Sequence, residues 1–414
     1  MKFKDYRIAP EIRRSLEDLD FKKPTDIQYK AIPPILRGED VLAIAQTGTG
    51  KTAAFAIPII HLINQQKESN KSLGIQCVVM VPTRELAIQI TDVFTAIGKY
   101  TDVVTFTVYG GVDQDPQINQ LNKGVDIIVA TPGRMFDLVS QKHIILKTVK
   151  VLILDEADHM LDLGFIKDIY DVIKYIPKKH QTLFFSATIN KKIKKLAYSL
   201  VSNPIRIQIS PNNPVAKNIV HSVAFIDMDD KRFFLERIIN ENPDDKILVF
   251  VRTKVRAERV MKALERVEIA SQTIHSGKEQ DDRQTVLADF KSGKNNILIA
   301  TDVSSRGIDI PNVDTVINYD LPEQSENYVH RVGRTGRASK KGQAISFCSD
   351  NEKLILEEIE KYLDKKITIL DISKKDYFET IELSNETHSD WKTLIQQTAE
   401  IKSHQKKIKK KKKK

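Results

Sequence analysis

The sequence predicts an α/β fold built from two parallel-sheet lobes in tandem. Short apolar segments alternate with helical stretches along most of the chain, which is the pattern of parallel βαβ units. The segments form two series of similar length and rhythm, and only the first contains a glycine-rich turn of the phosphate-binding type. We expect strands near residues 41–45, 77–81, 103–108, 126–130, 150–154 and 182–186 in the first lobe, and near 222–226, 246–251, 271–274, 296–300, 314–318 and 343–348 in the second.

A change in composition between the two series marks the expected boundaries. The stretch Ser210-Pro-Asn-Asn-Pro214 reads as a linker, because Pro and Asn interrupt regular structure. We therefore expect a first lobe over residues 1–209, a linker over 210–220 and a second lobe over 221–370. Residues 371–400 are polar and mixed, with the lone Trp391, and look like an appendage, so residues 371–414 are expected to form a C-terminal extension.

A glycine-rich turn follows the first expected strand. Val41–Ala45 runs into Gln46-Thr-Gly-Thr-Gly-Lys-Thr52. Such a turn points backbone N–H groups at phosphates, its lysine reaches the β- and γ-phosphates, and its terminal hydroxyl ligates Mg²⁺. The usual pattern begins with Gly where this chain has Ala45, but Gly48 and Gly50 still permit a close approach to phosphates. The alternative is an ordinary glycine-rich turn before a helix.

Three carboxylates follow another apolar segment. Val151-Leu-Ile-Leu154 is followed by Asp155, Glu156 and Asp158. Because an open α/β sheet binds ligands beyond the carboxyl ends of its strands, carboxylates there are placed to hold a cation beside a phosphate. The run alone could be a solvated acidic turn. Together with the glycine-rich turn, it predicts a chain that binds and hydrolyses a nucleoside triphosphate.

Hydroxyl, glycine or arginine clusters end further strands in both series. They are Pro82-Thr-Arg84, Thr131-Pro-Gly-Arg134, Ser186-Ala-Thr188, and Thr301-Asp302 followed by Arg306-Gly-Ile-Asp309. Strands commonly end in turn residues, so ordinary turn chemistry is the alternative for each cluster. Their repetition along one edge of both lobes predicts a continuous functional rim.

The net charge of +10 is concentrated at one end of the chain. Residues 401–414 contain nine lysines and no acidic residue, so the rest of the chain carries only about +1. We expect a disordered tail that binds nucleic-acid phosphates without reading their sequence. A solubilising tail or an expression-derived addition is the alternative.

Composition argues against several other classes of protein. No apolar run reaches membrane-spanning length, and the first residues lack the apolar core of a signal peptide. Cys77 and Cys348 lie in separate apolar segments, which indicates buried thiols and no disulfide framework or zinc site. The nine histidines form no metal-type pair. We expect a cytoplasmic protein without membrane contact.

Over roughly residues 3–350, the chain resembles the DEAD-box RNA helicases. Phe21-Lys-Lys-Pro-Thr-Asp-Ile-Gln28 resembles the Q motif, with Phe3 as its upstream aromatic residue. Asp155-Glu-Ala-Asp158 followed by Met160-Leu-Asp-Leu-Gly-Phe165 is similar to the RhlE-like bacterial branch. Further matches are the paired Gly110 and Gly111, Gln280 with Arg283, and the arginine-rich segment His330–Arg337; minor departures are Asp20 and Ser305.

The resemblance implies two RecA-like lobes with the ATP site in the cleft between them. Gln28 would read the adenine edge and Phe21 would stack on its ring. Asp155 would hold Mg²⁺ through water together with Thr52, and Glu156 would deprotonate the attacking water. Implied catalytic residues are Lys51, Asp155, Glu156, Arg334 and Arg337, the arginines acting as fingers from the second lobe; implied nucleotide-binding residues are Phe21, Gln28, Gln46, Thr47, Gly48, Thr49, Gly50, Lys51, Thr52, Gly307, Asp309, Arg334 and Arg337.

The resemblance also implies a track for RNA along the rim. Hydroxyls, glycine N–H groups and arginines contact phosphate and sugar, so little sequence preference is expected. Coupling between ATP and RNA would fall to Ser186 and Thr188, while His330 and Arg331 would tie the rim to the first lobe. The implied RNA contacts are Pro82, Thr83, Arg84, Gly110, Gly111, Thr131, Gly133 and Arg134 in one lobe, and Arg252, Thr253, His275, Gly277 and Thr301 in the other.

The leading functional hypothesis is an ATP-dependent RNA helicase that couples RNA-stimulated ATP hydrolysis to local unwinding of short RNA duplexes. An ATP-gated RNA clamp that nucleates an assembly needs the same residues and stays open as an alternative. A DNA translocase is disfavoured by the adenine-specific Q motif. The resemblance implies a monomer that requires ATP and Mg²⁺, with ribosome assembly or RNA turnover as the setting.

Overall fold

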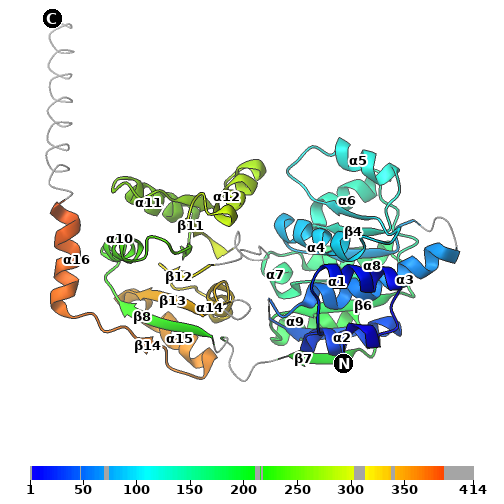
Figure 1. The fold of residues 1–414 in the computed structure, drawn as a ribbon, viewed down its shortest axis with the longest axis horizontal. Coiled ribbons are helices and arrows are strands. Elements are labelled where there is room, and N and C mark those ends of the chain that lie inside the picture. Colours follow the sequence, from blue (N-terminus) through cyan, green and yellow to red (C-terminus); the bar gives the residue numbers. More distant parts are fainter. Residues whose placement is uncertain are drawn as a thin grey trace, which may run out of the picture. The chain divides into compact units, whose positions relative to one another are not determined.

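The computed structural model describes residues 2–46, 48–69, 74–209, 215, 218–302, 313–336 and 341–386, and the structural statements below refer to them. The chain forms two compact units, and each contains one seven-stranded parallel sheet between helices (Figure 1). The predicted fold class of two parallel-sheet lobes in tandem is therefore confirmed.

The sheet of the first unit has the strand order β3-β4-β2-β5-β6-β1-β7. Its strands are β1 (Val41–Ala45), β2 (Cys77–Met80), β3 (Thr105–Val108), β4 (Ile127–Ala130), β5 (Val151–Leu154), β6 (Gln181–Ser186) and β7 (Ile205–Ile209). Its helices are η1 (Phe3–Asp5), α1 (Pro10–Asp18), α2 (Asp26–Leu36), α3 (Lys51–Ser69), α4 (Arg84–Ile97), α5 (Asp115–Asn122), α6 (Pro132–Ser140), α7 (Ala157–Asp162), α8 (Ile166–Tyr175) and α9 (Lys191–Leu200).

Strand β1 shows why these segments are apolar without interruption. Its residues alternate between two cores, because successive side chains of a strand point to opposite faces of the sheet. Val41, Ala43 and Ala45 join the core on one face, whereas Leu42 and Ile44 join the core on the other. Helices cover both faces, so the strand has no solvent side and needs no polar residue.

The second unit repeats the strand order of the first. Its order is β10-β11-β9-β12-β13-β8-β14, so each strand takes the place of the strand seven earlier in the chain. The strands are β8 (Ile219–Phe225), β9 (Ile247–Phe250), β10 (Gln272–Ile274), β11 (Ile297–Ala300), β12 (Thr315–Asn318), β13 (Gly342–Cys348) and β14 (Thr368–Ile369). The helices are α10 (Lys231–Glu241), α11 (Lys254–Glu265), α12 (Gln280–Ser292), α14 (Ser325–Val332), η2 (Asp350–Glu352), α15 (Lys353–Leu363) and α16 (Lys374–Glu386).

Each strand that we predicted is present, but β7 and β14 were not predicted. Both lie at the end of their sheets, where one side of the strand is unpaired. In β7 only Ile207 is buried, and both residues of β14 are exposed. Edge strands of this kind lack the continuous apolar run by which we identified the others.

Helix α16 is part of the packed second unit, although the sequence suggested an appendage. Tyr377 lies 4.9 Å from Phe234 between ring centroids, and its hydroxyl donates to Asp230 Oδ2 at 2.9 Å. Burial raises the pKa of Tyr377 to about 12. The Nη1 atom of Arg237 in α10 also donates to the Thr380 hydroxyl at 2.8 Å. These contacts fasten α16 to α10.

Two further expectations concern the cysteines and the membrane. Cys77 and Cys348 are free and buried, as predicted. Among the described helices, none is both long enough and apolar enough to cross a bilayer.

Candidate functional site

The candidate residues of the first unit share the carboxyl edge of one sheet. The segments after β3, β4 and β2 carry Gly110–Gly111, Thr131–Arg134 and Pro82–Arg84. The next strands along the sheet, β5, β6 and β1, end in Asp155–Asp158, Ser186–Thr188 and the glycine-rich turn. The strand order therefore puts the predicted RNA side on three neighbouring strands and the predicted nucleotide side on the next three.

The glycine-rich turn has the backbone shape that close phosphate approach requires. Gly48 and Gly50 have φ values of 80° and 89°, which L residues rarely adopt. The Thr49 hydroxyl donates to the Gln46 carbonyl at 2.8 Å and closes the turn. Lys51 then begins helix α3, so the turn presents the N-terminus of a helix. Thr47 lies outside the described residues.

Lys51 and Asp155 face each other in a buried setting. Lys51 Nζ lies 3.8 Å from Asp155 Oδ1, and both side chains are almost fully buried. No hydrogen bond satisfies this Nζ within the described part of the chain. Burial raises the pKa of Asp155 to about 6, against the attraction of Lys51, while the nearby Glu156 raises it further. In the described residues, the Lys51 ammonium therefore lacks a hydrogen-bond acceptor, and the charged form of Asp155 is disfavoured by its burial.

These residues fit a nucleoside triphosphate with its metal. A buried ammonium that lacks an acceptor suits a phosphate, and a carboxyl group with a raised pKa gains from a nearby divalent cation. No group of three His, Cys, Asp or Glu side chains that could hold a metal occurs in the described ranges. The metal role predicted for Thr52 and Asp155 stays a prediction.

Glu156 has a strained backbone at the end of β5. Its φ and ψ are 51° and 46°, which is the left-handed region, and its side chain is buried. Its amide donates to Asp155 Oδ1 at 2.9 Å, and its Oε2 lies 3.5 Å from Nδ1 of the buried His159. These contacts keep Glu156 beside Asp155 in spite of the backbone strain, and its role as the catalytic base stays a prediction.

The ends of β5 and β6 are joined by hydrogen bonds. Asp158 Oδ2 accepts from the Thr188 backbone N–H at 3.0 Å and from its hydroxyl at 3.1 Å. The Ser186 hydroxyl donates to the Thr188 carbonyl at 2.8 Å. Because β6 lies between β5 and β1, this link connects the segment after β6 to the predicted metal side. Such a link is what the predicted coupling role of Ser186 and Thr188 requires.

The amide of Gln28 contacts the glycine-rich turn. Its Oε1 accepts from the Thr25 amide at 3.0 Å, and its Nε2 donates to the Gly50 carbonyl at 3.1 Å. A Cβ atom at Gly50 would lie 2.6 Å from this Nε2, and the φ of 89° at Gly50 also disfavours other residues. Phe21 is half-buried and packs edge-on against Phe3 with centroids 5.8 Å apart. The segment predicted to read adenine is therefore tied directly to the phosphate turn.

Arg84 and Arg134, which follow β2 and β4, both contact the segment after β3. The Thr83 hydroxyl caps helix α4 by accepting from the Leu86 amide at 3.3 Å, which sets the position of Arg84. Gly111 has a φ of 78°, and a Cβ atom there would overlap the Arg84 guanidinium. Arg134 Nη2 donates to the Val112 carbonyl at 2.9 Å. Pro82, Thr131 and Gly133 lie in the same segments, at the first turns of α4 and α6.

The second unit brings its predicted RNA contacts together in the same way. Arg252 and Thr253 follow β9, His275 and Gly277 follow β10, and Thr301 follows β11. These three strands are neighbours in the order β10-β11-β9, which matches β3-β4-β2 of the first unit. Each unit therefore carries its RNA candidates on the same three strands.

The His275 side chain forms its two hydrogen bonds with residues of the second unit. Its Nδ1 accepts from the Gly277 amide at 3.2 Å, so the proton is on Nε2, which donates to Glu258 Oε1 at 2.8 Å. The side chain is almost fully buried. The imidazole thus positions the Gly277 backbone, and the direct RNA contact of His275 stays a prediction.

Arg331, which we predicted to tie the rim to the first lobe, forms a network of hydrogen bonds. It is buried inside the second unit, where Nε and Nη2 pair with Asp302 Oδ1 and Oδ2 at 2.5 and 2.7 Å. Its Nη1 donates to the Asp320 carbonyl at 2.7 Å. These hydrogen bonds all lie within the second unit, and the predicted tie of Arg331 to the first lobe stays a prediction. Asp302 belongs to a polar cluster that we identified at the end of a strand, but its pairing with Arg331 was not predicted.

The remaining predicted nucleotide contacts of the second unit lie around the end of α14. Arg334 is buried, and its Nε donates to the carbonyl of His330 at 3.2 Å. Gly307, Asp309 and Arg337 lie outside the described residues.

Two family models match the chain. The DEAD/DEAH box helicase model matches residues 25–196, and the helicase conserved C-terminal domain model matches residues 230–339. The first contains the glycine-rich turn, Asp155–Asp158 and Ser186–Thr188, and the second contains Arg252, His275 and Arg334.

The similar proteins have names that agree with these models. The DEAD-box ATP-dependent RNA helicase RhpA of Helicobacter pylori is 40% identical over 370 residues, which cover 89% of this chain and 74% of that protein. The ATP-dependent RNA helicase DbpA of Bacillus subtilis is 40% identical over 366 residues, covering 88% and 75%. The structure of S. cerevisiae Dbp5 bound to RNA and ADP BeF3 has a TM-score of 0.82 at 31% identity and covers 93% of this chain and 99% of that one.

Proposed function

The chain belongs to the DEAD-box family of ATP-dependent RNA helicases, and we propose that its two units couple RNA-stimulated ATP hydrolysis to local unwinding of short RNA duplexes. The observation that carries the nucleotide part is Lys51, a buried ammonium without a hydrogen-bond acceptor in the described residues, placed 3.8 Å from Asp155. A triphosphate supplies the missing acceptors and Mg²⁺ supplies the missing positive charge.

The proposed chemistry divides among few residues. Lys51 and the turn Gln46–Thr52 bind the phosphates, and Glu156 takes a proton from the attacking water. Thr52 and Asp155 would hold Mg²⁺, which would neutralise the charge of the phosphates. Arg334 and Arg337 of the second unit stabilise the negative charge of the transition state. Gly307 and Asp309 contact the ribose. Gln28 and Phe21 select adenine.

The proposed RNA track uses the matching strand ends of the two units. Backbone amides, hydroxyls and arginines bind phosphate and sugar, which suits RNA of any sequence. Residues 1–209 act as the ATP-binding domain, 210–220 as the linker, 221–370 as the C-terminal helicase domain and 371–414 as the extension. We also propose that the protein is a cytoplasmic monomer that acts in ribosome assembly or RNA turnover.

Strand displacement from a short, labelled RNA duplex tests this function. We expect displacement with ATP and Mg²⁺, and none with ADP. Lys51→Ala should fail because the phosphates lose their buried cation, whereas Lys99→Ala should work as wild type, because Lys99 is an exposed lysine that pairs with Asp18. Displacement by Lys51→Ala at the wild-type rate would contradict the proposal.

A further inference from the structure

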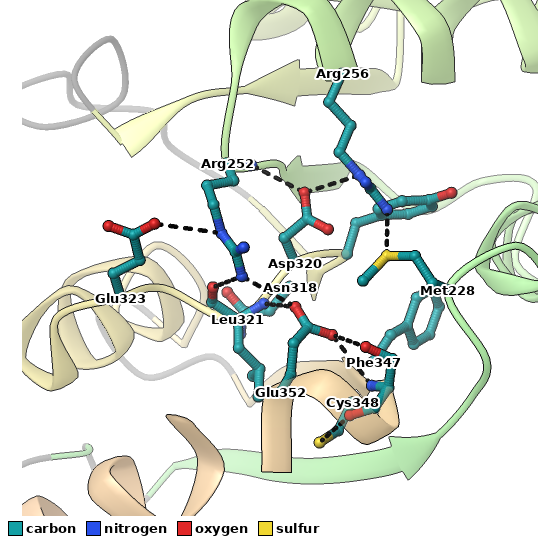
Figure 2. Close-up of polar contacts among 12 residues, drawn as sticks. Met228, Arg252, Arg256, Asn318, Asp320, Leu321, Glu323, Phe347, Cys348 and Glu352 are labelled. Carbon is teal, nitrogen blue, oxygen red and sulfur yellow. Dashed lines mark hydrogen bonds and ion pairs between the residues drawn. The ribbon is translucent and has the colours of Figure 1, made fainter. Parts of the chain in front are cut away.

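Ion pairs fill the carboxyl edge of the second sheet, where β9, β12 and β13 end (Figure 2). Lys231, the first residue of α10, is fully buried and donates to the carbonyls of Tyr319 at 2.8 Å and Phe347 at 3.3 Å. It also pairs with the buried carboxylate of Glu352 and lies 4.0 Å from Asp320 Oδ1.

Lys231 takes the place in the second unit that Lys51 takes in the first. Lys51 begins the helix that follows β1, and Lys231 begins the helix that follows β8, which is the equivalent strand of the second sheet. Lys51 lies 3.8 Å from Asp155, after β5, and Lys231 lies 4.0 Å from Asp320, after the equivalent strand β12. Lys51 lacks a hydrogen-bond acceptor in the described residues, whereas Lys231 has three. Glu352 and two backbone carbonyls therefore supply to Lys231 the acceptors that Lys51 lacks in the described residues.

Glu352 is the centre of this network. Its Oε2 accepts from Lys231, from the Ser349 amide at 3.1 Å and from the Ser349 hydroxyl at 2.8 Å. Its Oε1 accepts from the Leu321 amide at 3.1 Å and from Arg252 Nη2 at 3.3 Å. Burial alone would raise the pKa of Glu352, but Lys231 and the Ser349 hydrogen bonds outweigh it and lower that pKa. The carboxylate is therefore ionised and fixed in place.

Arg252 is held differently on its two sides. On the inner side, Nη2 meets Glu352 and the Leu321 carbonyl, and the Arg252 amide donates to Asp320 Oδ2 at 3.0 Å. On the outer side, Nε lies 3.8 Å from Glu323 Oε1. The side chain of Glu352 is 2% exposed and that of Glu323 is 72% exposed. The guanidinium thus has one permanent carboxylate partner and one that faces water (Figure 2).

We propose that Glu352 is a positioning residue that fixes Arg252 for RNA binding, and that Glu323 occupies the outer side of the guanidinium until an RNA phosphate replaces it. This assignment rests on the RNA binding proposed above. Carboxylate and phosphate oxygens bind a guanidinium with the same geometry, so the two compete for one place. An exposed ion pair is weak and is easily displaced, whereas a buried carboxylate with four other donors is not.

The two carboxylates should have opposite effects on RNA affinity. In the full chain, with labelled single-stranded RNA, Mg²⁺ and a non-hydrolysable ATP analogue, Glu323→Gln should bind RNA about 2–5-fold more tightly, because a competing charge is gone. Glu358→Gln, which removes an exposed charge of the same unit from α15, is the matched control. Affinity of Glu323→Gln equal to that of the control, or weaker, overturns the proposal.

Glu352→Gln should weaken RNA binding about tenfold, because Arg252 loses its anionic anchor. The KM for ATP should stay unchanged, because none of the residues that Glu352 contacts, Lys231, Leu321, Ser349 and Arg252, is assigned to the nucleotide. In an Arg252→Ala background the same change should have no effect on RNA affinity. A loss of equal size in that background would show that Glu352 acts only on the fold. If Glu352→Gln lowers the melting temperature sharply, the pair Lys231→Met with Glu352→Gln, which leaves no unpaired charge, replaces it in the same cycle.

The wild-type titration separates this proposal from the one on which it rests. A wild-type chain that fails to bind RNA contradicts the proposed function itself. Wild-type binding with an unchanged affinity for Glu323→Gln contradicts only the assignment of Glu323 and Glu352.

Discussion

Asp158 Oδ2 accepts two hydrogen bonds from Thr188, one from its amide at 3.0 Å and one from its hydroxyl at 3.1 Å. The two residues follow neighbouring strands, β5 and β6, and Asp158 is three residues from Asp155. One carboxylate therefore joins the segment after β5 to the segment after β6. This is the physical link that we assign to coupling.

Replacing Thr188 by Val should uncouple unwinding from hydrolysis. The hydroxyl donor to a charged acceptor is lost, at a cost of about 1.5–3 kcal/mol, while the backbone bond stays. RNA-stimulated ATP hydrolysis should persist and strand displacement should fall tenfold or more. Thr148→Val, at an exposed threonine whose hydroxyl donates only to the Ile75 carbonyl, is the control. Parallel loss of both activities would place Thr188 in hydrolysis itself.

Glu156→Gln should bind ATP and RNA but hydrolyse poorly. The amide keeps the size of the side chain and cannot accept the proton, so the rate should fall about 10²–10⁴-fold. Lys51→Ala should instead weaken nucleotide binding, because its buried ammonium is removed. Binding of a fluorescent ATP analogue and single-turnover hydrolysis separate the two effects. Near-normal turnover by Glu156→Gln would refute its assignment as the base.

The stability of the nucleotide-free protein should depend on Asp155 and on pH. Its folded pKa of about 6 is above the ordinary 3.8, so the folded state binds this proton more tightly than the unfolded state does. Stability from this group is full below pH 4 and falls as pH rises through 6, by up to about 3 kcal/mol. Asp155→Asn should therefore raise the free energy of unfolding at pH 7 and have little effect near pH 4, with part of the gain offset by the lost attraction to Lys51.

Denaturant unfolding of the wild-type protein and of Asp155→Asn, at pH 4 and pH 7 without nucleotide, measures this pH dependence of stability. A stabilisation that is the same at pH 4 and pH 7 would mean that charge burial is not its cause.

The lysine-rich tail should contribute to RNA affinity in a salt-dependent way. A chain ending at Ser403 lacks eight of the nine lysines of residues 401–414. For single strands, the salt slope is about −0.7 per phosphate neutralised, so a tail that engages roughly four phosphates would steepen it by about 3 units. Titration of one RNA across a salt series, with and without the tail, measures this. Equal slopes would leave the lysines as a solvated appendage.

The sequence was sufficient for the fold wherever strands are buried on both faces. Segments such as Val151–Leu154 consist of apolar residues only, and each became a central strand. The strands β7 and β14 escaped prediction because they lie at sheet edges and expose most of their residues. The phosphate turn and Asp155–Asp158 were also identifiable, because each is contiguous in the chain and its geometry follows from the strand that precedes it.

Long-range polar pairs could not be predicted in the same way. Arg331 pairs with Asp302 across 29 residues, and Lys231 pairs with Glu352 across 121. The residues that flank Lys231 and Arg331 in the sequence do not indicate a buried partner, because the pairing depends on which strands become neighbours. The branch of the family, which we predicted as RhlE-like, likewise stays a prediction.

The most direct test compares ATP hydrolysis by the full chain and by residues 1–209, each without RNA and with saturating RNA. We predict strong RNA stimulation of the full chain, none of residues 1–209, and none of full-length Arg334→Ala, because we assign the arginines that stabilise the transition state to the second unit. Circular dichroism of each protein confirms that it is folded. RNA-stimulated hydrolysis by residues 1–209 at the rate of the full chain would contradict the account.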